Sequence, residues 1–233
     1  MTSQLLALCF DANDPRRLSR FWSDFLGWES VDDLDDGIVL LPSDDTGFRL
    51  RFLPSEEKKT SQNQMHFDLT STSLEDQQQT VDRALGLGAQ HIDVGQLPEE
   101  GHVVLADPEG NEFCVIEPGN KFLADCGFIG AVASDGTQEV GYFWSKALDW
   151  PLVWDQDEET AIRSPHGGPK ITWGGPPLAP KQPRNRLHLD LVADGDLEAE
   201  IDRLVFLGAA RTDVDDVLTD PDGNTFCLRA QNT

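Results

Sequence analysis

Residues 107–116 read Asp-Pro-Glu-Gly-Asn-Glu-Phe-Cys-Val-Ile, and residues 220–228 read Asp-Pro-Asp-Gly-Asn-Thr-Phe-Cys-Leu. In both copies a turn sequence runs directly into a short apolar strand that carries one cysteine. Proline fixes φ at the start of such a turn, and glycine or asparagine accepts the positive φ that follows. The repeated turn and strand therefore indicate that the chain contains one structural unit twice.

Other landmarks repeat in the same order. The Phe-Trp-Ser of residues 21–23 returns at 143–145, an offset of 122 residues (143 minus 21). The alternating segment Met-His-Phe-Asp-Leu at 65–69 returns as Leu-His-Leu-Asp-Leu at 187–191, again 122 residues later (187 minus 65). Matched landmarks in constant order indicate an internal duplication.

Each half follows the order strand, helix, strands, and then repeats that order. In the first half, residues 5–10 predict a buried strand, and Asp14 followed by Pro15 predicts the start of a helix. The sequence therefore predicts two domains, at residues 1–118 and 124–231.

Composition narrows the classes of partner. The chain has 233 residues, 39% of them hydrophobic and 26% charged, with a formal net charge of −24. Such a charge disfavours binding to nucleic acid and to anionic membranes. The apolar run at residues 5–10 is too short for a signal peptide or a membrane span, so we expect a cytoplasmic protein with reduced cysteines.

The repeated motifs resemble a known family. The Phe-Trp-Ser-Asp-Phe-Leu-Gly-Trp of residues 21–28 and the two Asp-Pro turns resemble the glyoxalase-like domains of the vicinal oxygen chelate superfamily. This superfamily includes glyoxalase I, extradiol dioxygenases and bleomycin-resistance proteins. The resemblance implies an α+β fold of four βαβββ modules, whose mixed sheets curl into clefts. It also implies a small-molecule ligand, and either a monomer with an internal pseudo-dimer or a homodimer.

The resemblance bears on metal binding as well. Metal-dependent members carry His, Gln or Glu ligands on the first and last strands of their modules, and His66 and His188 match two of these positions. The glutamate usually found seven residues after the aspartate of the Asp-Pro turn is replaced by Cys114 and Cys227. We therefore expect no metal cofactor. A divalent ion would have to use a soft ligand set such as Cys9, His66 and Cys114, which suits zinc.

Alternation along the repeated His-x-Asp strands gives the best candidates for a cleft. His66 and Asp68 lie on one face of their strand, opposite the apolar side chains between them, and His188 and Asp190 repeat this arrangement. Each histidine is either a polar cleft residue hydrogen-bonded to the neighbouring carboxylate or to the backbone, or part of a ligand-binding or acid–base site. The cysteines that replace glutamate are either small buried apolar side chains or cleft residues.

Further ligand-binding candidates share the phase of these strands. Glu112 lies in phase with Cys114, and Arg229 lies in phase with Cys227. Trp173, next to Thr172 on an expected cleft strand, is a candidate for stacking on a flat ligand. The alternatives are a core position for the tryptophan and ion pairs with the abundant acids for the arginines.

Three functional hypotheses follow. The first is a small-molecule-binding protein without the usual metal site of the family, of the resistance or sequestration type. The second is a metal-dependent lyase, isomerase or dioxygenase that uses His66. The third is a catalytically inactive, duplicated scaffold. No catalytic residue is assigned, and the sequence leaves open whether the chain is an enzyme and which ligand it takes.

Overall fold

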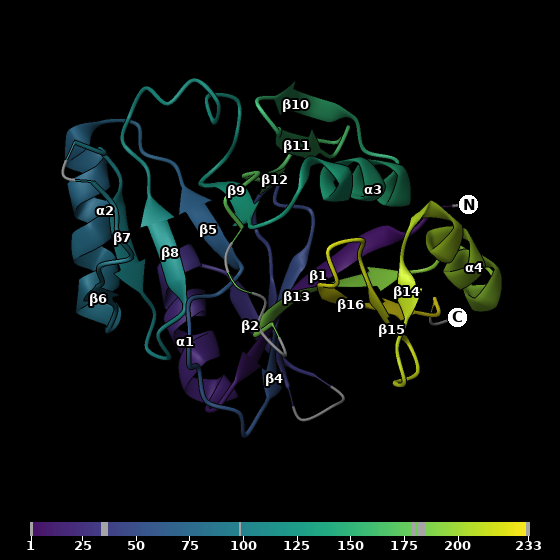
Figure 1. Ribbon diagram of the computed structural model, residues 1–233. Coiled ribbons are helices and arrows are strands. Elements are labelled where there is room, and N and C mark those ends of the chain that lie inside the picture. The colour runs from purple at the N-terminus through teal and green to yellow at the C-terminus, as the bar shows by residue number, and fades with distance from the viewer. Residues whose placement is uncertain (1, 34–36, 98, 179, 181–184, 232–233) are drawn as a thin grey trace.

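The computed structural model describes residues 2–33, 37–97, 99–178, 180 and 185–231. Within these residues the chain forms four helices and two eight-stranded mixed sheets (Figure 1), which confirms the predicted α+β class. In Figure 1, α2 and α4 lie at opposite ends of the molecule, and both termini lie near α4.

The elements form four modules, each a strand, a helix and three further strands. Module 1 contains β1 (Gln4–Ala12), α1 (Pro15–Leu26), β2 (Glu29–Asp32), β3 (Ile38–Leu41) and β4 (Arg49–Pro54). Module 2 contains β5 (Met65–Leu69), α2 (Leu74–Leu87), β6 (Gln90–His91), β7 (Val103–Ala106) and β8 (Glu112–Val115). Module 3 contains β9 (Ile129–Ser134), α3 (Gln138–Leu148), β10 (Leu152–Gln156), β11 (Glu159–Arg163) and β12 (Lys170–Trp173). Module 4 contains β13 (Leu187–Val192), α4 (Leu197–Leu207), β14 (Ala210–Arg211), β15 (Val217–Thr219) and β16 (Thr225–Arg229).

Each sheet takes one module from each half of the chain. Sheet A has the strand order β14-β15-β16-β13-β1-β4-β3-β2 and joins module 1 to module 4. Sheet B has the order β10-β11-β12-β9-β5-β8-β7-β6 and joins module 2 to module 3. The modules meet at two antiparallel pairs, β1 with β13 and β5 with β9. A cleft lined by either sheet is therefore shared between the two halves.

The repeated Asp-Pro turn joins the end of each half to its first helix. Trp22 of α1 donates from Nε1 to the Asp107 carboxylate at 3.1 Å, and Trp144 of α3 donates to Asp220 at 3.3 Å. The Asp107 carboxylate also accepts the backbone N–H of Asn111 at 3.0 Å. One buried carboxylate thus closes the turn and fixes the helix, which explains why tryptophan and turn recur together.

The third residue of each turn accepts backbone N–H groups just before the helix that the turn contacts, α1 for the first turn and α3 for the second. Glu109 accepts the backbone N–H groups of Asn13 and Asp14 at 2.9 and 2.6 Å, directly before α1. Asp222 accepts the backbone N–H of Thr137 at 2.7 Å, directly before α3. A carboxylate beside these free N–H groups stabilises a helix start. The acidic third position of the motif therefore has a structural role.

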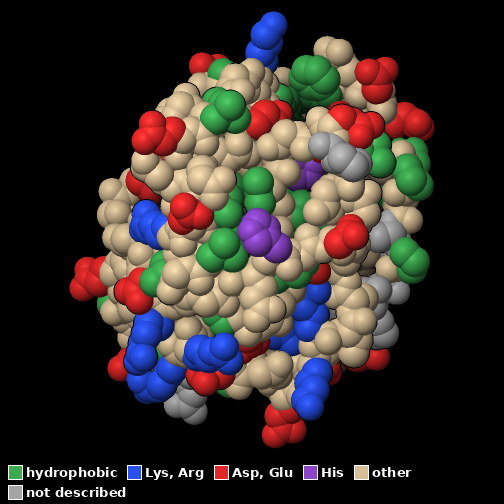
Figure 2. Space-filling model, turned by 90° about the vertical axis from the view of Figure 1, so that its left-hand side faces the viewer, with side chains coloured by type: hydrophobic (Ala, Val, Ile, Leu, Met, Phe, Trp, Pro, Cys, Tyr) green, Lys and Arg blue, Asp and Glu red, His purple; other side chains and the backbone are tan. Residues whose placement is uncertain are grey.

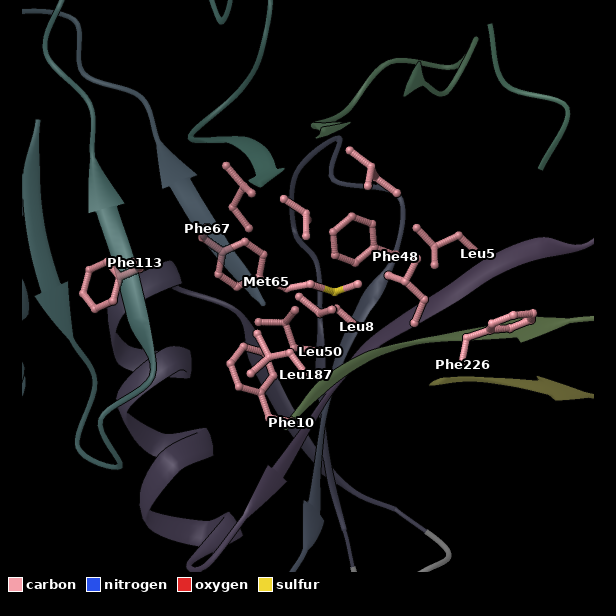
Figure 3. Close-up of a cluster of buried hydrophobic side chains, with 14 of the residues drawn as sticks. Leu5, Leu8, Phe10, Phe48, Leu50, Met65, Phe67, Phe113, Leu187 and Phe226 are labelled. Atoms are coloured by element: carbon pink, nitrogen blue, oxygen red, sulfur yellow. The ribbon is translucent and has the colours of Figure 1, made fainter. Parts of the chain in front are cut away.

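The main hydrophobic core lies on the sheet faces that the helices cover. Figure 3 shows this core, where side chains from β1, β4, β5, β8, β13 and β16 meet. The ring of Phe10 stacks on Phe52 with centroids 5.1 Å apart, and Trp22 of α1 contacts Phe67 of sheet B at 5.4 Å. Because side chains alternate along β1, Cys9 points to the opposite face of sheet A. The faces turned away from this core carry the polar candidates.

The outside of the molecule reflects its composition. On the face in Figure 2, Asp and Glu side chains are scattered over the surface, and His side chains lie near the middle beside hydrophobic and uncharged atoms. None of the described helices is long and apolar enough to cross a membrane.

Candidate functional site

The site begins with two polar side chains on β5. Met65, Phe67 and Leu69 of this strand are buried in the main core. Strand alternation therefore turns His66 and Asp68 to the other face of sheet B, as predicted. There His66 Nε2 lies 3.4 Å from Asp68 Oδ1, and the two side chains remain 34% and 21% exposed. The predicted contact between the histidine and its neighbouring carboxylate is present, and solvent reaches both groups.

Cys114 of β8 completes a cluster with these residues. It lies directly opposite Asp68 in the parallel pairing of β5 with β8. One donor atom from each of His66, Asp68 and Cys114 lies within 4.8 Å of the other two. Among the described residues this is the one such group of three potential metal ligands. We call the surface formed by His66, Asp68, Cys114, Ala131, Ala133 and Thr172 the His66 face.

The cluster favours a positive charge on the imidazole. Burial lowers the pKa of His66, but hydrogen bonds and charge interactions with Asp68 and then Cys114 outweigh this effect and raise the pKa to about 10. The charge of His66 also acts on Asp135, directly after β9. Partial burial raises the pKa of the Asp135 carboxyl, and the nearby His66 charge acts in the opposite direction. At neutral pH the cluster therefore holds an imidazolium ion among carboxyl groups.

The donor set also fits a divalent ion. Zinc binds nitrogen, sulfur and oxygen at about 2.0–2.3 Å, and its catalytic sites use three protein ligands and leave a fourth position open. His66, Asp68 and Cys114 provide one ligand of each kind. Glu112 and the second histidine take no part in this group.

Glu112, the carboxylate expected to serve this cleft, has other partners. It lies in phase with Cys114, but its Oε1 accepts from Lys59 Nζ at 2.5 Å, and its Oε2 accepts the backbone N–H of Asn63 at 3.2 Å. These contacts tie the loop before β5 to β8. The carboxylate that meets His66 is instead Asp68.

The expected position of Trp173 is wrong. Trp173 shares the phase of Ile171 and is buried with it in the main core, so it cannot stack on a ligand at the His66 face. The next residue back, Thr172, lies opposite Ala133 and faces the site. The apolar Ile171 was the signal in the sequence that could have fixed the phase of this strand.

The second His-x-Asp strand lies on the corresponding surface of sheet A. We call the surface formed by Cys9, Arg51, His188, Asp190, Cys227 and Arg229 the Asp190 face. Here Asp190 is completely buried, and its carboxylate accepts from Arg51 at 2.6 Å and from Arg229 Nε at 2.8 and 2.9 Å. Arg51 also donates from Nε to Asp33 at 2.8 Å. The ion-pair alternative for Arg229 is thus the observed one.

Cys9 belongs to this face and not to the His66 cluster, so the ligand set of Cys9, His66 and Cys114 is wrong. The cause is module pairing, because β1 pairs with β13 and not with β5. Cys9 Sγ lies 3.9 Å from Asp190 Oδ2. Burial and then the charge of Asp190 raise the pKa of Cys9, and the same two causes raise the pKa of Cys227 to about 11. Both thiols are protonated at neutral pH.

Two positions make the faces different. Arg51 lies opposite Cys9 on sheet A, and the corresponding residue on sheet B is Thr172, opposite Ala133. Arg229 lies two residues beyond Cys227, and Ile116 lies two residues beyond Cys114. The arginines bind Asp190 on one face, whereas Asp68 on the other face remains available to His66.

Comparison with known proteins supports the family seen in the motifs. A family model for a glyoxalase-like domain matches residues 7–116 and 131–229. No curated protein matches the chain. The crystal structure of glyoxalase I from Zea mays is similar with a TM-score of 0.66 and 12% identity, covering 97% of this chain and 92% of that chain. A putative dioxygenase from Bacillus subtilis subsp. subtilis str. 168 is similar with a TM-score of 0.63 and 14% identity, covering 100% and 86%. At such identities the two structures share the fold with this chain.

Proposed function

The chain belongs to the glyoxalase-like domain family of the vicinal oxygen chelate superfamily, and we propose that it binds a small molecule on the His66 face. The observation that carries this proposal is the contrast between the two faces. On the Asp190 face, Asp190, Arg51 and His188 are buried and the partly exposed Arg229 side chain (39%) is paired with Asp190, whereas the side chains of His66 and Asp68 are 34% and 21% exposed. An accessible group of convergent polar side chains beside apolar ones is the usual form of a ligand site.

The proposal includes binding without the glutamate-based metal site of the family. Cys114 stands where the resemblance places that glutamate, and Glu112 is engaged by Lys59. His66 would donate a hydrogen bond to the ligand, and Asp68 would orient the imidazole. A binding or sequestering protein needs no more than this.

The experiment is a thermal-shift screen with aromatic drugs and small carbonyl compounds, made with the wild type, His66→Ala and His188→Ala. His188→Ala is the matched control because it removes the equivalent side chain from the closed face. A compound at 100 times its Kd adds about 2.7 kcal/mol to the stability, which raises Tm by about 5–10 °C in a chain of this size. We expect this shift to disappear in His66→Ala and to persist in His188→Ala. Equal shifts in wild type and His66→Ala would contradict the proposal.

A second candidate function is metal-dependent catalysis, favoured by the grouping of His66, Asp68 and Cys114 within 4.8 Å. These residues would hold the ion, which would polarise a substrate oxygen as a Lewis acid. The discriminating measurement is the metal content of protein purified without chelator, for the wild type, His66→Ala and Cys114→Ser. If the wild type contains a stoichiometric metal that both substitutions remove, the metal-free proposal is wrong and metal-dependent catalysis takes its place. If the protein contains no metal and no compound stabilises it, the hypothesis of a catalytically inactive scaffold would remain.

A further inference from the structure

A further cavity lies beside α1, outside the two faces described above. It has a volume of about 430 Å³, and residues of α1, the C-terminal end of α2 and the first Asp-Pro turn line it. Three arginines of α1, Arg16, Arg17 and Arg20, border this cavity. None of the described residues that line it belongs to the His66 face or to the Asp190 face, so the cavity is separate from the proposed ligand site.

Two of these arginines have no acidic partner in the part of the chain that the structure describes. Arg17 and Arg20 are exposed, and no ion pair or side-chain hydrogen bond to a described residue engages either guanidinium group. Arg16 reaches Asp32 only at 3.9 Å, and these two side chains are 80% and 83% exposed. The chain has 42 acidic and 18 basic residues, so arginines without an acidic partner are unexpected.

The three arginines do not stabilise α1. Arg16 and Arg17 lie in its first turn, which contains no acidic residue, and the helix dipole disfavours positive charge there. Arg20 lies four residues after Arg16 and three after Arg17, and like charges at these spacings repel each other. The other three helices carry Asp or Glu in the first turn. The stability of the helix therefore does not explain the arginines.

The second half of the chain builds the equivalent helix without them. The positions that correspond to Arg16 and Arg20, at the offset of 122 residues, are Gln138 and Tyr142 of α3. Gln138 Nε2 and the Tyr142 hydroxyl both donate to the Asp155 carboxylate, at 2.8 and 2.9 Å. The fold thus accepts neutral side chains at these positions, and the unpaired arginines are a property of the first half.

The charges at the cavity favour an anion. Two carboxylates, Asp14 and Asp24, line it beside the three arginines. Asp14 Oδ1 accepts the backbone N–H of Arg17 at 3.0 Å, so this carboxylate is engaged as the cap of α1. The net charge of −24 has little influence here, because salt at physiological concentration screens exposed charges beyond about 8 Å. The local excess of arginine therefore determines which ligand is attracted.

We propose that this cavity is a second binding site, for a small organic carboxylate. Guanidinium groups present paired N–H donors that match the two oxygens of a carboxylate, and Arg17 and Arg20 supply them. The apolar part of the ligand lies on Leu87 and Pro108, which are half-buried at the cavity. Apolar side chains with a few charged groups, in a cavity of this size, are usual for a small-molecule site.

The test is an NMR titration of the isotope-labelled full chain with acetate, butyrate and hexanoate. Backbone amide shifts identify the residues that meet the ligand and so distinguish this cavity from the His66 face. We expect saturable shifts at Phe21, Leu87 and Gly88. The affinity should rise about twofold with each methylene, because the half-buried apolar residues cover only part of it. Hexylamine at the same concentrations should not shift these amides.

The variant that carries Arg17→Gln and Arg20→Gln should bind hexanoate at least about tenfold more weakly. Its Tm should be equal or higher, because α1 loses unfavourable charges, so weaker binding would not reflect unfolding. Arg211→Gln is the matched control, since it removes an exposed arginine that is paired with Glu198 and Asp202, and it should bind hexanoate as the wild type does.

Three results would overturn the inference. The first is an unchanged affinity for hexanoate in the double variant. The second is equal binding of acetate and hexanoate, and the third is the absence of saturable shifts at Phe21, Leu87 and Gly88. None of these results bears on the proposed function, which depends on the comparison of His66→Ala with His188→Ala.

Discussion

At the scale of single residues, Arg51 and Arg229 determine which face is closed. Both bind Asp190, and Arg51 also binds Asp33, so the buried carboxylate has its charge neutralised from two sides. Among the residues that the structure describes, the corresponding Asp68 forms its ion pair with His66. Arg51 and Arg229 thus account for the difference between the faces: Asp190 belongs to a structural ion-pair network, and Asp68 belongs to an accessible site.

Replacement of Arg51 tests the network. Arg51→Met would leave a buried carboxylate without its closest partner, and we expect a loss of about 3–5 kcal/mol in the free energy of unfolding. Urea denaturation measures this change. Arg211→Met removes an arginine from the exposed acids Glu198 and Asp202 and should change nothing measurable. A small effect at Arg51 would show that the pair does not stabilise the closed face.

The charge of His66 predicts a pH dependence of stability. Its pKa is about 10 in the folded protein, above the ordinary value of 6.5 expected after unfolding. A raised folded value means that protonated His66 stabilises the fold fully below pH 6.5, and that this contribution is lost as the pH rises through about 10. Wild type should therefore lose stability relative to His66→Gln across this window, measured by urea denaturation with chelator present. A constant difference would show that His66 is neutral throughout.

Part of the site could be predicted from the sequence, because it depends on residues close together in the chain. Strand alternation placed His66 beside Asp68, and residue counting found Cys114 where a glutamate was expected. Asp135 was missed because it lies near His66 only through the pairing of β5 with β9, which joins residues far apart in the chain. The engagement of Asp190 by Arg51 was missed for the same reason, since it depends on the pairing of β1 with both β4 and β13.

At the scale of elements, α3 packs against β11 more closely than a side chain would allow. A Cβ atom at Gly141 would lie 2.0 Å from Thr160 Oγ1 and 2.5 Å from Thr160 Cβ. Thr160 is buried on β11, so it cannot move away without disturbing the sheet. Glycine in the middle of this helix is thus explained by packing.

Gly141→Ala tests this contact. Alanine should gain about 1 kcal/mol in helix propensity, but overpacking costs about 1–3 kcal/mol and more for so close an approach. We therefore expect a net loss of stability in thermal and urea denaturation. Gly86→Ala in α2 is the control, because a Cβ atom there meets nothing within 4 Å and the substitution should stabilise the protein. Stabilisation by both substitutions would contradict the close packing.

At the scale of the whole molecule, each sheet depends on both halves. Residues 1–118 contain β1 and β5, whose partners at the joints are β13 and β9 in residues 124–231. The repeats were visible in the sequence because motifs are local. The pairing of module 1 with module 4 could not be predicted from the sequence. Equivalent modules have equivalent strand edges, and the segments that connect the modules decide which edges pair.

This arrangement predicts how one half behaves alone. A protein made of residues 1–118 should form a homodimer, in which β1 of one copy pairs with β5 of the other, since β5 corresponds to β13 in the repeat. Light scattering after size-exclusion chromatography measures the mass, and the complete chain provides the comparison. A folded monomer of this half would show that β1 and β5 can pair within one copy.

The joint at β1 and β13 also has an evolutionary consequence. In a homodimer of single domains, symmetry repeats every substitution in both clefts, so neither cleft can change alone. Here Arg51 and Arg229 bind Asp190 on one face, and the corresponding positions of the other face hold Thr172 and Ile116, so a mutation on one face does not alter the residues of the other. Duplication within one chain thus freed the two surfaces from symmetry. One of them could become fixed interior structure while the other stayed open to selection for a ligand.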